Sequence, residues 1–328
     1  MLRFGLLGAG RIGAIHGANI AAHGAAQLVG IADIHQPAAE ALAAKLGTKV
    51  ASVAAILADP AIDAVVIASS TDTHAPLIEA AARAGKAIFC EKPIDLDSGR
   101  VAACLKVVAD CGVPLGLGFN RRFDPSFRAL RDAVRAGRIG KVEMVCITSR
   151  DPGPPPVSYI KVSGGLFRDM MIHDLDMARW LLGEEPVEVF ATASCLVDPA
   201  IGAAGDVDTA IVTLKTASGV LCQINNSRRA VYGYDQRVEV LGSAGMLQAG
   251  NRTPTTVECS DGQAVSRDKP LHFFLERYAE AYRSELDGFI RAVAADRSPD
   301  PGGDDGYKVL LLADAAAKSF ATGQPVRF

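Results

Sequence analysis

The sequence predicts an α/β protein of two domains, and three observations lead to this prediction. The chain has 328 residues, more than the roughly 250 to 300 at which a single hydrophobic core usually stops growing. As far as residue 118, short apolar runs alternate with helix-length amphipathic segments. Beyond residue 187 the pattern changes to alternating, β-branched runs joined by glycine turns. We therefore expect one domain over 1–120 and a different one over 121–328.

The first domain is predicted to be a doubly wound parallel sheet. Strands are expected over 2–7, 27–32, 64–68, 87–90 and 113–117. Helices are expected over 11–23, 36–46, 74–84 and 97–110. Strands separated by helical segments form right-handed crossovers, which place helices on both faces of a parallel sheet.

The second domain is predicted to contain a mostly antiparallel sheet. A helix near 124–136 is followed by "PGPPPVSYIKVSGG", whose proline and glycine content predicts an irregular loop. The strand-like runs are "VEVFATASCLV", "DTAIVTLKTASGVLCQINNSRR", "QRVEVLGSAGMLQAG" and "TTVECSDG". Helical segments near 271–296 and 304–321 close the chain. Alternating runs joined by glycine turns are typical of antiparallel strands.

The composition argues against several classes of protein. The net charge is -3 and the pI is near 6.1, so there is no broad basic field for nucleic acid, and we expect none as a partner. The first apolar run is too short for a signal peptide or membrane helix, so we expect a cytoplasmic protein without membrane contact. Seven cysteines without a C-x-x-C pair argue against a disulfide framework or a zinc site.

A glycine-rich motif follows the first predicted strand. Gly8, Gly10 and Gly13 form G-x-G-x-x-G at the start of a predicted helix, with Arg11 and Ile12 between them. Gly8 would allow the tight turn, Gly10 the approach of a pyrophosphate, and Gly13 close packing of the helix on the strand. A phosphate would lie at the helix N-terminus, where free N–H groups favour negative charge. The motif predicts a dinucleotide-binding Rossmann domain.

An acidic residue follows at the expected distance from this motif. Asp33 ends the second predicted strand, where its carboxylate could accept hydrogen bonds from the ribose hydroxyls. A carboxylate would repel a 2'-phosphate, so we expect NAD rather than NADP. The alternative is a glycine-rich turn and a strand-end aspartate that bind no cofactor.

Two further stretches carry candidate catalytic residues. Lys92, in Glu91-Lys92-Pro93, follows a strand of the first domain and should project toward the nicotinamide; taken alone, it could be a solvated surface cation. In "GGLFRDMMIHDLDMARWLLG", helical spacing places Asp169, His173 and Asp176 on one stripe. A histidine beside carboxylates suits a general acid or base, although it could also be a satisfied interior histidine. The spacing argues against a metal site.

These motifs, in this order, resemble the glucose-fructose oxidoreductase, inositol dehydrogenase and rhizopine-catabolism family (Gfo/Idh/MocA). The resemblance covers essentially the full chain, including the closing "DDGYKVLLLADAAAKSFATGQPV". It implies an N-terminal Rossmann domain that binds NAD. It also implies a C-terminal α/β domain with a large open sheet for substrate binding and oligomerisation, with a homotetramer favoured and a dimer possible.

The resemblance also implies roles for individual residues. Lys92, Asp169 and His173 would form the catalytic set, with His173 as general base and Asp176 fixing its tautomer. The expected cofactor-binding residues are Gly8, Gly10, Arg11, Ile12, Gly13, Asp33, Thr71, His74, Glu91 and Lys92. The expected substrate-binding residues are Asn120, Arg121, Asp151, Asp169, His173 and Tyr234, and the neighbouring Arg122 and Tyr232 are further candidates.

The implied activity is NAD-dependent oxidation of a secondary alcohol on a cyclitol or sugar. "GFNRRFDPSF" and "SRRAVYGYDQRVEVLGSAGML" favour the inositol-oxidising members, with myo-inositol converted to 2-keto-myo-inositol (scyllo-inosose). Another cyclitol, an aldose or an amino-sugar derivative is the alternative substrate. A nicotinamide-binding sensor without turnover is the alternative of another class.

Overall fold

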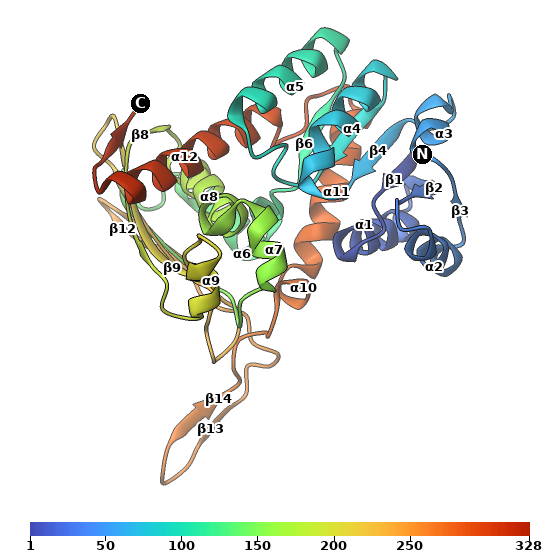
Figure 1. Cartoon of the computed structure of the whole chain (residues 1–328). Coiled ribbons are helices and arrows are strands. Elements are labelled where there is room, and N and C mark those ends of the chain that lie inside the picture. Colours follow the sequence, from blue (N-terminus) through green and yellow to red (C-terminus); the bar gives the residue numbers. More distant parts are fainter. The chain divides into compact units, whose positions relative to one another are not determined.

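The computed structural model describes all 328 residues and divides into two compact units (Figure 1). The first unit contains Met1–Asn120 and Ala281–Leu310, and the second contains Arg121–Glu280 and Leu311–Phe328. Asn120 and Arg121 thus fall in different units. Residues 281–310 were expected in the second domain but belong to the first unit.

The first unit is built on a six-stranded sheet in which every pair of neighbouring strands is parallel. The strand order is β3-β2-β1-β4-β5-β6. The strands are β1 (Leu2–Leu7), β2 (Ala26–Ala32), β3 (Lys49–Val50), β4 (Ala64–Ile67), β5 (Ala87–Cys90) and β6 (Leu115–Leu117). This is the predicted doubly wound Rossmann sheet, and the chain reverses its winding direction between β1 and β4, where such sheets bind ligands.

The helices of the first unit follow the predicted segments closely. They are α1 (Arg11–Ala22), α2 (Gln36–Leu46), α3 (Val53–Ala58), α4 (Thr71–Arg83) and α5 (Ser98–Cys111). Gly47 and Gly112 end α2 and α5 in the left-handed conformation, which glycine adopts without steric cost. The sequence did not predict β3 or α3, because elements this short carry too little periodic pattern.

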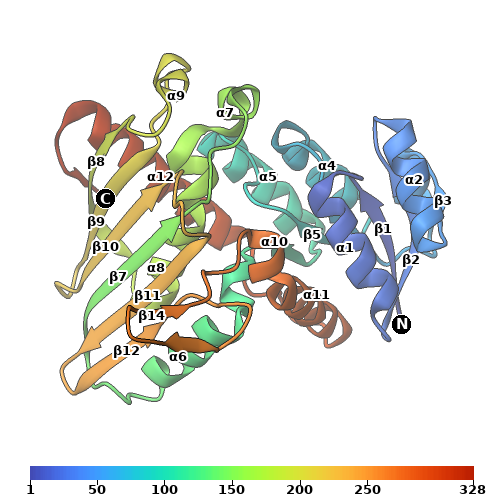
Figure 2. The ribbon, with the colours of Figure 1, turned by 90° about the horizontal axis from the view of Figure 1, so that it is seen from below.

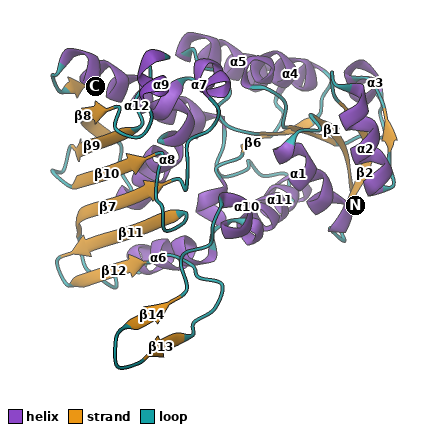
Figure 3. Cartoon of the chain, turned by 60° about the horizontal axis from the view of Figure 1, so that its bottom comes forward, coloured by secondary structure: helices purple, strands orange, loops and turns teal.

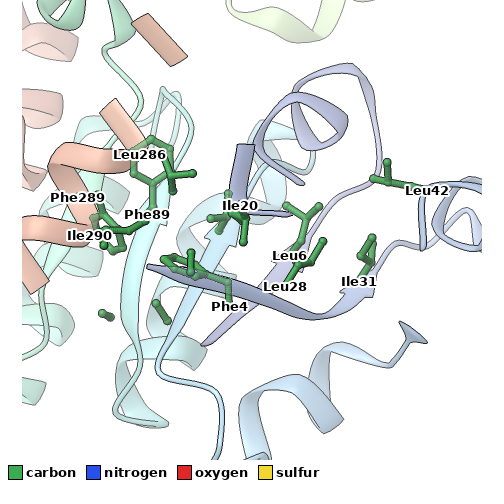
Figure 4. Close-up of a cluster of buried hydrophobic side chains, with 14 of the residues drawn as sticks. Phe4, Leu6, Ile20, Leu28, Ile31, Leu42, Phe89, Leu286, Phe289 and Ile290 are labelled. Carbon is green, nitrogen blue, oxygen red and sulfur yellow. The ribbon is translucent and has the colours of Figure 1, made fainter. Parts of the chain in front are cut away.

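A late helix completes the core of the first unit. In α11 (Ala279–Ala294), Leu286, Phe289 and Ile290 are buried in the same cluster as Phe4 and Phe89 (Figure 4). The Phe289 ring lies 5.6 Å from the Phe89 ring in an edge-to-face arrangement, a geometry that adds to the energy of apolar burial. This packing explains why residues 281–310 belong to the first unit.

The second unit is built on a seven-stranded sheet with the order β12-β11-β7-β10-β9-β8-β15 (Figure 2). Its strands are β7 (Val142–Arg150), β8 (Pro186–Ser194), β9 (Thr209–Thr216), β10 (Leu221–Ser227), β11 (Asp235–Gly242), β12 (Gly245–Ala249) and β15 (Val326–Arg327). Only β7 and β10 pair in parallel, so the prediction of a mostly antiparallel sheet is confirmed. A separate hairpin of β13 (Glu258–Ser260) and β14 (Val265–Arg267) stands apart from these strands (Figure 3).

Helices cover one face of the seven-stranded sheet, with α6 against β12 and α8 against β7 and β10. The remaining elements are the 3-10 helix η1 (Asn120–Phe123), α6 (Pro125–Arg135), α7 (Val157–Ser163), the π-helical turn η2 (Leu166–Met170), α8 (Ile172–Leu182), α9 (Pro199–Ala203), α10 (Phe274–Arg277) and α12 (Gly303–Thr322). The prediction that "PGPPPVSYIKVSGG" is irregular throughout was wrong, because its prolines end at Pro156 and the next seven residues form α7. No helix is both long enough and apolar enough to cross a membrane.

Candidate active site

The glycine-rich loop has the geometry that its sequence predicts. Gly8 has a φ of +115°, and a side chain there would collide with the backbone of Ala68. A Cβ on Gly13 would lie 2.0 Å from the carbonyl oxygen of Gly8, so only glycine lets α1 approach the loop this closely. At Gly10 a Cβ would meet no atom within 4 Å, and no side chain caps the N-terminus of α1. The residues therefore fit a pyrophosphate over Gly10, as the motif predicts.

Asp33 belongs to the same loop structure. One carboxylate oxygen accepts a hydrogen bond from the backbone N–H of Ala9 at 2.6 Å, and the other accepts from His35 N–H at 2.7 Å. The side chain is partly exposed at the end of β2. Asp33 thus has a structural function, holding the glycine-rich loop, that the sequence did not indicate. Its contact with the ribose remains a prediction.

Thr71 and His74 lie in the first turn of α4, but only Thr71 is partly exposed. His74 is buried, with Nδ1 2.7 Å from the carbonyl oxygen of Pro93 and Nε2 3.1 Å from that of Ser69. His74 therefore ties the segment after β4 to the Glu91-Lys92-Pro93 segment after β5. This contact supports the backbone beside Lys92, whereas direct contact of either residue with the cofactor remains a prediction.

Glu91 precedes Lys92 and is fixed from the opposite side. Its Oε1 lies 2.6 Å from Nε2 of His16, which is fully buried in α1. Its backbone N–H donates to the carbonyl oxygen of Ile67 at the end of β4. Lys92 therefore lies between two residues that each contact another element of the first unit, beyond the end of a parallel strand, where such sheets bind ligands.

The stretch with Asp169 and His173 does not form one regular helix. Leu166–Met170 is a π-helical turn, closed by a hydrogen bond from Met171 N–H to the carbonyl oxygen of Leu166, and α8 begins at Ile172. Asp206 starts this turn by accepting a hydrogen bond from Leu166 N–H, and a side chain at Gly165 would collide with its carboxylate. The prediction of one α-helical stripe was therefore wrong, since an inserted π turn changes the direction of side chains across it.

Asp169 and His173 are both partly exposed, and Asp169 has defined partners. Tyr159 donates its hydroxyl to Asp169 Oδ1 at 2.9 Å. The guanidinium of Arg228, only 1% exposed, has a nitrogen 3.8 Å from Asp169 Oδ2 and 3.6 Å from Asp206 Oδ2. The sequence analysis missed Tyr159 and Arg228. Arginine is rarely buried, so a buried arginine can indicate a functional site, but the burial of Arg228 cannot be read from the sequence.

Two residues of "GFNRRF" serve the scaffold. Arg121 is buried and donates to Asp174 Oδ1 at 2.5 Å, and Arg122 donates to both oxygens of Asp176. Burial works to lower the pKa of Arg121, but the charge of Asp174 outweighs it and raises that pKa. Asp176 therefore anchors α8 to η1, and its expected action on the His173 tautomer remains a prediction.

The other expected substrate residues lie in or beside strands and turns of the second unit, except Asn120, which is buried at the end of the first. Asp151 follows β7 and is mostly, but not fully, buried. Burial, partly offset by Arg228 and Arg121, raises its pKa to about 6. Tyr234 is buried, and its ring meets that of Tyr278 edge to face at 5.9 Å. Tyr232 precedes β11 and donates its hydroxyl to Asp235, the first residue of that strand.

Both units match models of one protein family. Residues 2–119 match the oxidoreductase family with an NAD-binding Rossmann fold, and residues 127–248 match the GFO/IDH/MocA C-terminal domain. The chain belongs to the Gfo/Idh/MocA family. The resemblance noted in the sequence is thereby confirmed, and the Gfo/Idh/MocA protein described here is an NAD-dependent oxidoreductase.

Individual members of the Gfo/Idh/MocA family are similar to this chain over nearly their whole length. Inositol 2-dehydrogenase from Rhizobium meliloti (strain 1021) is 59% identical over 321 residues, which cover 98% of this chain and 97% of that protein. The structure of a myo-inositol dehydrogenase from Corynebacterium glutamicum ATCC 13032 has a TM-score of 0.96 at 46% identity, covering 100% of this chain and 99% of that one. Myo-inositol dehydrogenase from Lactobacillus casei, in complex with NAD(H) and myo-inositol, has a TM-score of 0.89 at 26% identity, covering 100% and 97%.

Proposed function

We propose that the protein oxidises myo-inositol at one secondary alcohol to 2-keto-myo-inositol, with NAD as the hydride acceptor. The observation that carries this proposal is the 59% identity, over 98% of the chain, to a protein named inositol 2-dehydrogenase. Two features of the site support it. The glycine-rich loop and Asp33 suit NAD, and Lys92, Asp169 and His173 supply the ionisable groups that alcohol oxidation needs.

The proposed chemistry assigns one function to each of three side chains. NAD, when bound, supplies the carbon that accepts the hydride. His173 accepts the hydroxyl proton as general base, because its unperturbed pKa is close to the operating pH. Lys92, as an ammonium group, donates a hydrogen bond to the same oxygen and stabilises its developing negative charge. Asp169, oriented by Tyr159, accepts a hydrogen bond from the substrate or from Lys92.

A polyol substrate requires several hydrogen-bonding groups in its site. We assign Asp151 and Tyr234 as direct contacts, with Asn120 as a further one. Arg121 is assigned an indirect function, because its guanidinium is already engaged by Asp174. A site that satisfies each hydroxyl rejects analogues that lack one, since the unpaired partner is then left buried.

The first test follows reduced nicotinamide at 340 nm with NAD or NADP. The substrates are myo-inositol, scyllo-inositol, D-chiro-inositol, glucose and xylose. We expect turnover of myo-inositol with NAD, and a loss of kcat of about 10²- to 10⁴-fold in His173→Ala and in Lys92→Ala. His272→Ala is the matched control, because His272 is outside the proposed site, and it should keep wild-type kcat.

The alternative outcomes discriminate between readings of the site. Higher kcat/KM for another polyol would keep the mechanism and replace the substrate. NAD binding without turnover of any substrate would favour a nicotinamide-binding sensor. Higher efficiency with NADP would contradict the function of Asp33.

We also propose that the open sheet of the second unit assembles subunits, with a tetramer favoured over a dimer. Strand register places Met246, Leu241, Met144 and Leu221 in one row across β12, β11, β7 and β10, on the face opposite α6 and α8. Met246 and Leu221 are each 50% exposed. Leu241 and Met144 between them are partly exposed, and a continuous row of apolar side chains that reach the surface is typical of a protein interface.

Sedimentation velocity at micromolar concentration tests this assembly. The wild type should sediment as an oligomer and Leu221→Glu/Met246→Glu as a smaller species, because the substitutions place charges in the apolar row. Gln248→Glu, on the same face but outside that row, is the control. A wild type that sediments only as a monomer would refute the assembly.

A further inference from the structure

Three ionisable side chains of the first unit form a buried group that the proposed reaction does not use. His16 comes from α1, Glu91 from the segment after β5, and Glu285 from α11. One nitrogen or oxygen atom of each lies within 4.8 Å of the others. We call this group the His16–Glu91–Glu285 cluster.

The contact between His16 and Glu91 orients the imidazole. The 2.6 Å distance between His16 Nε2 and Glu91 Oε1 is a hydrogen bond, and a carboxylate can only accept it, so Nε2 carries the proton. Nδ1 of His16 is buried without a hydrogen-bond partner. The rings of Phe89 and Tyr282 pack edge to face on the imidazole.

Glu285 lacks the contacts that an ionised carboxylate needs. It is 1% exposed, and neither of its oxygens has a hydrogen-bond partner. The ionisable groups around it are His16 from α1, Glu91 from the segment after β5 and, one turn away on α11, Tyr282. None of these is an arginine or a lysine. Burial, together with the charge of Glu91, raises the pKa of Glu285 well above its usual range.

We propose that Glu285 is held as a neutral carboxylic acid, which leaves Glu91 on His16 and thereby positions the adjacent Lys92. The positioning step rests on the function proposed for Lys92. The Glu91 carboxylate packs closely on Gly118, where glycine leaves room for it, since a Cβ there would lie 2.7 Å from its Oε2. If Glu285 ionised, the two carboxylates would repel each other in a medium of low dielectric constant, and the Glu91 side chain would be displaced from His16.

The proposal predicts a definite pH dependence of stability. The pKa of Glu285 is raised on folding, so its favourable contribution is complete below the ordinary glutamate pKa and decreases as pH rises toward the folded value. Glu285→Gln is neutral at every pH and similar in shape. Its melting temperature should equal that of the wild type near pH 4.5 and exceed it by about 2 to 4 °C at pH 8.

The experiment measures melting temperature and kcat from pH 4.5 to 9.5 for the wild type, Glu285→Gln, Glu91→Gln and the double variant. The gain in melting temperature from Glu285→Gln should shrink when Glu91→Gln is also present, because the repelling charge is then absent. The alkaline decrease of kcat should shift to higher pH in Glu285→Gln, with kcat at pH 7 within about threefold of the wild type. Glu280→Gln, 50% exposed on the same helix, is the control and should show no pH-dependent gap.

Each of the following outcomes would contradict a different part of the proposal. A Glu285→Gln variant that is less stable than the wild type at pH 8 would mean that Glu285 is ionised and bound to a partner. A wild type that loses melting temperature in EDTA and regains it with Zn²⁺, while Glu285→Gln does neither, would make the cluster a metal site instead. A stability gap without any change in the kcat profile would refute the positioning of Lys92. If Lys92→Ala is fully active, the proposed function fails, and the melting data still test the neutral acid.

Discussion

In the second unit, each of the buried carboxylates Asp124, Asp174 and Asp176 lies against an arginine, whereas in the first unit the buried Glu285 lies beside another carboxylate. A buried charge must be paired or neutralised, and these residues use the two different solutions. Pairing makes each partner dependent on the other, because removal of one leaves an uncompensated charge. Neutralisation of Glu285 by a proton makes the stability of the first unit depend on pH instead.

The candidate catalytic residues of the two units are also supported by different kinds of contact. In the second unit, ion pairs from Arg121 and Arg122 tie the segment before α6 to α8, the helix that carries His173. In the first unit, hydrogen bonds from His16 and to the Pro93 carbonyl hold the segment that carries Lys92. The helix that carries His173, the proposed general base, is therefore placed by charged contacts, and the segment that carries Lys92 by hydrogen bonds to two histidines.

The largest effect is expected from breaking one buried ion pair. Asp174→Ala should lower the free energy of unfolding by about 3 to 5 kcal/mol, because Arg121 would remain buried and unpaired. Urea denaturation followed by the fluorescence of Trp180, the single tryptophan, reports on α8 directly. The double variant Arg121→Met/Asp174→Leu should recover most of the loss. A loss below about 1 kcal/mol in Asp174→Ala would contradict the importance of pairing.

A smaller effect is expected at Asp151, a carboxylate that is only partly compensated by Arg228 and Arg121. Burial raises its pKa to about 6, so the wild type loses stability as pH rises from about 4 to about 6, where the carboxyl ionises in the unfolded chain first. Asp151→Asn does not titrate. Its free energy of unfolding, relative to the wild type, should therefore increase by about 1 to 2 kcal/mol across this window and stay constant above pH 7. Denaturation at pH 4.5, 6 and 7.5 measures it, and a difference independent of pH would contradict the raised pKa.

The smallest effect is expected for a pair on the surface. Lys106 and Asp110 on α5 are 2.9 Å apart, but their side chains are 75% and 64% exposed. Asp110→Ala should cost at most about 0.5 kcal/mol, and 1 M NaCl should remove the difference. A loss comparable to that of Asp174→Ala would show that burial does not govern the strength of charge pairing in this chain.

Local patterns were sufficient for the parts of the structure that depend on neighbours in sequence. The tight turn at Gly8 and the close helix packing at Gly13 could be predicted, because they are set by the backbone of one turn. Five of the six strands of the parallel sheet, all except β3, were found within a few residues, because each is a short, largely buried apolar run.

Features that depend on distant contacts could not be obtained in this way. The amphipathic pattern of α11 indicates that Phe289 is buried but not that its partner is Phe89. The π turn before α8 depends on Asp206, about 40 positions further along the chain. The burial of Arg228 and Glu285 likewise follows from tertiary packing, and their residue types favour the surface.

The two hydrogen bonds of Asp33 constrain any redesign of cofactor preference. To admit a 2'-phosphate, an engineer would remove this carboxylate, but the same oxygens hold Ala9 and His35 in the loop. Replacement by alanine would remove the electrostatic repulsion, but it would also remove both hydrogen bonds and loosen the glycine-rich loop. Asparagine keeps an acceptor for one of the two N–H groups, so a change of specificity in this protein should begin there and add a cation only afterwards.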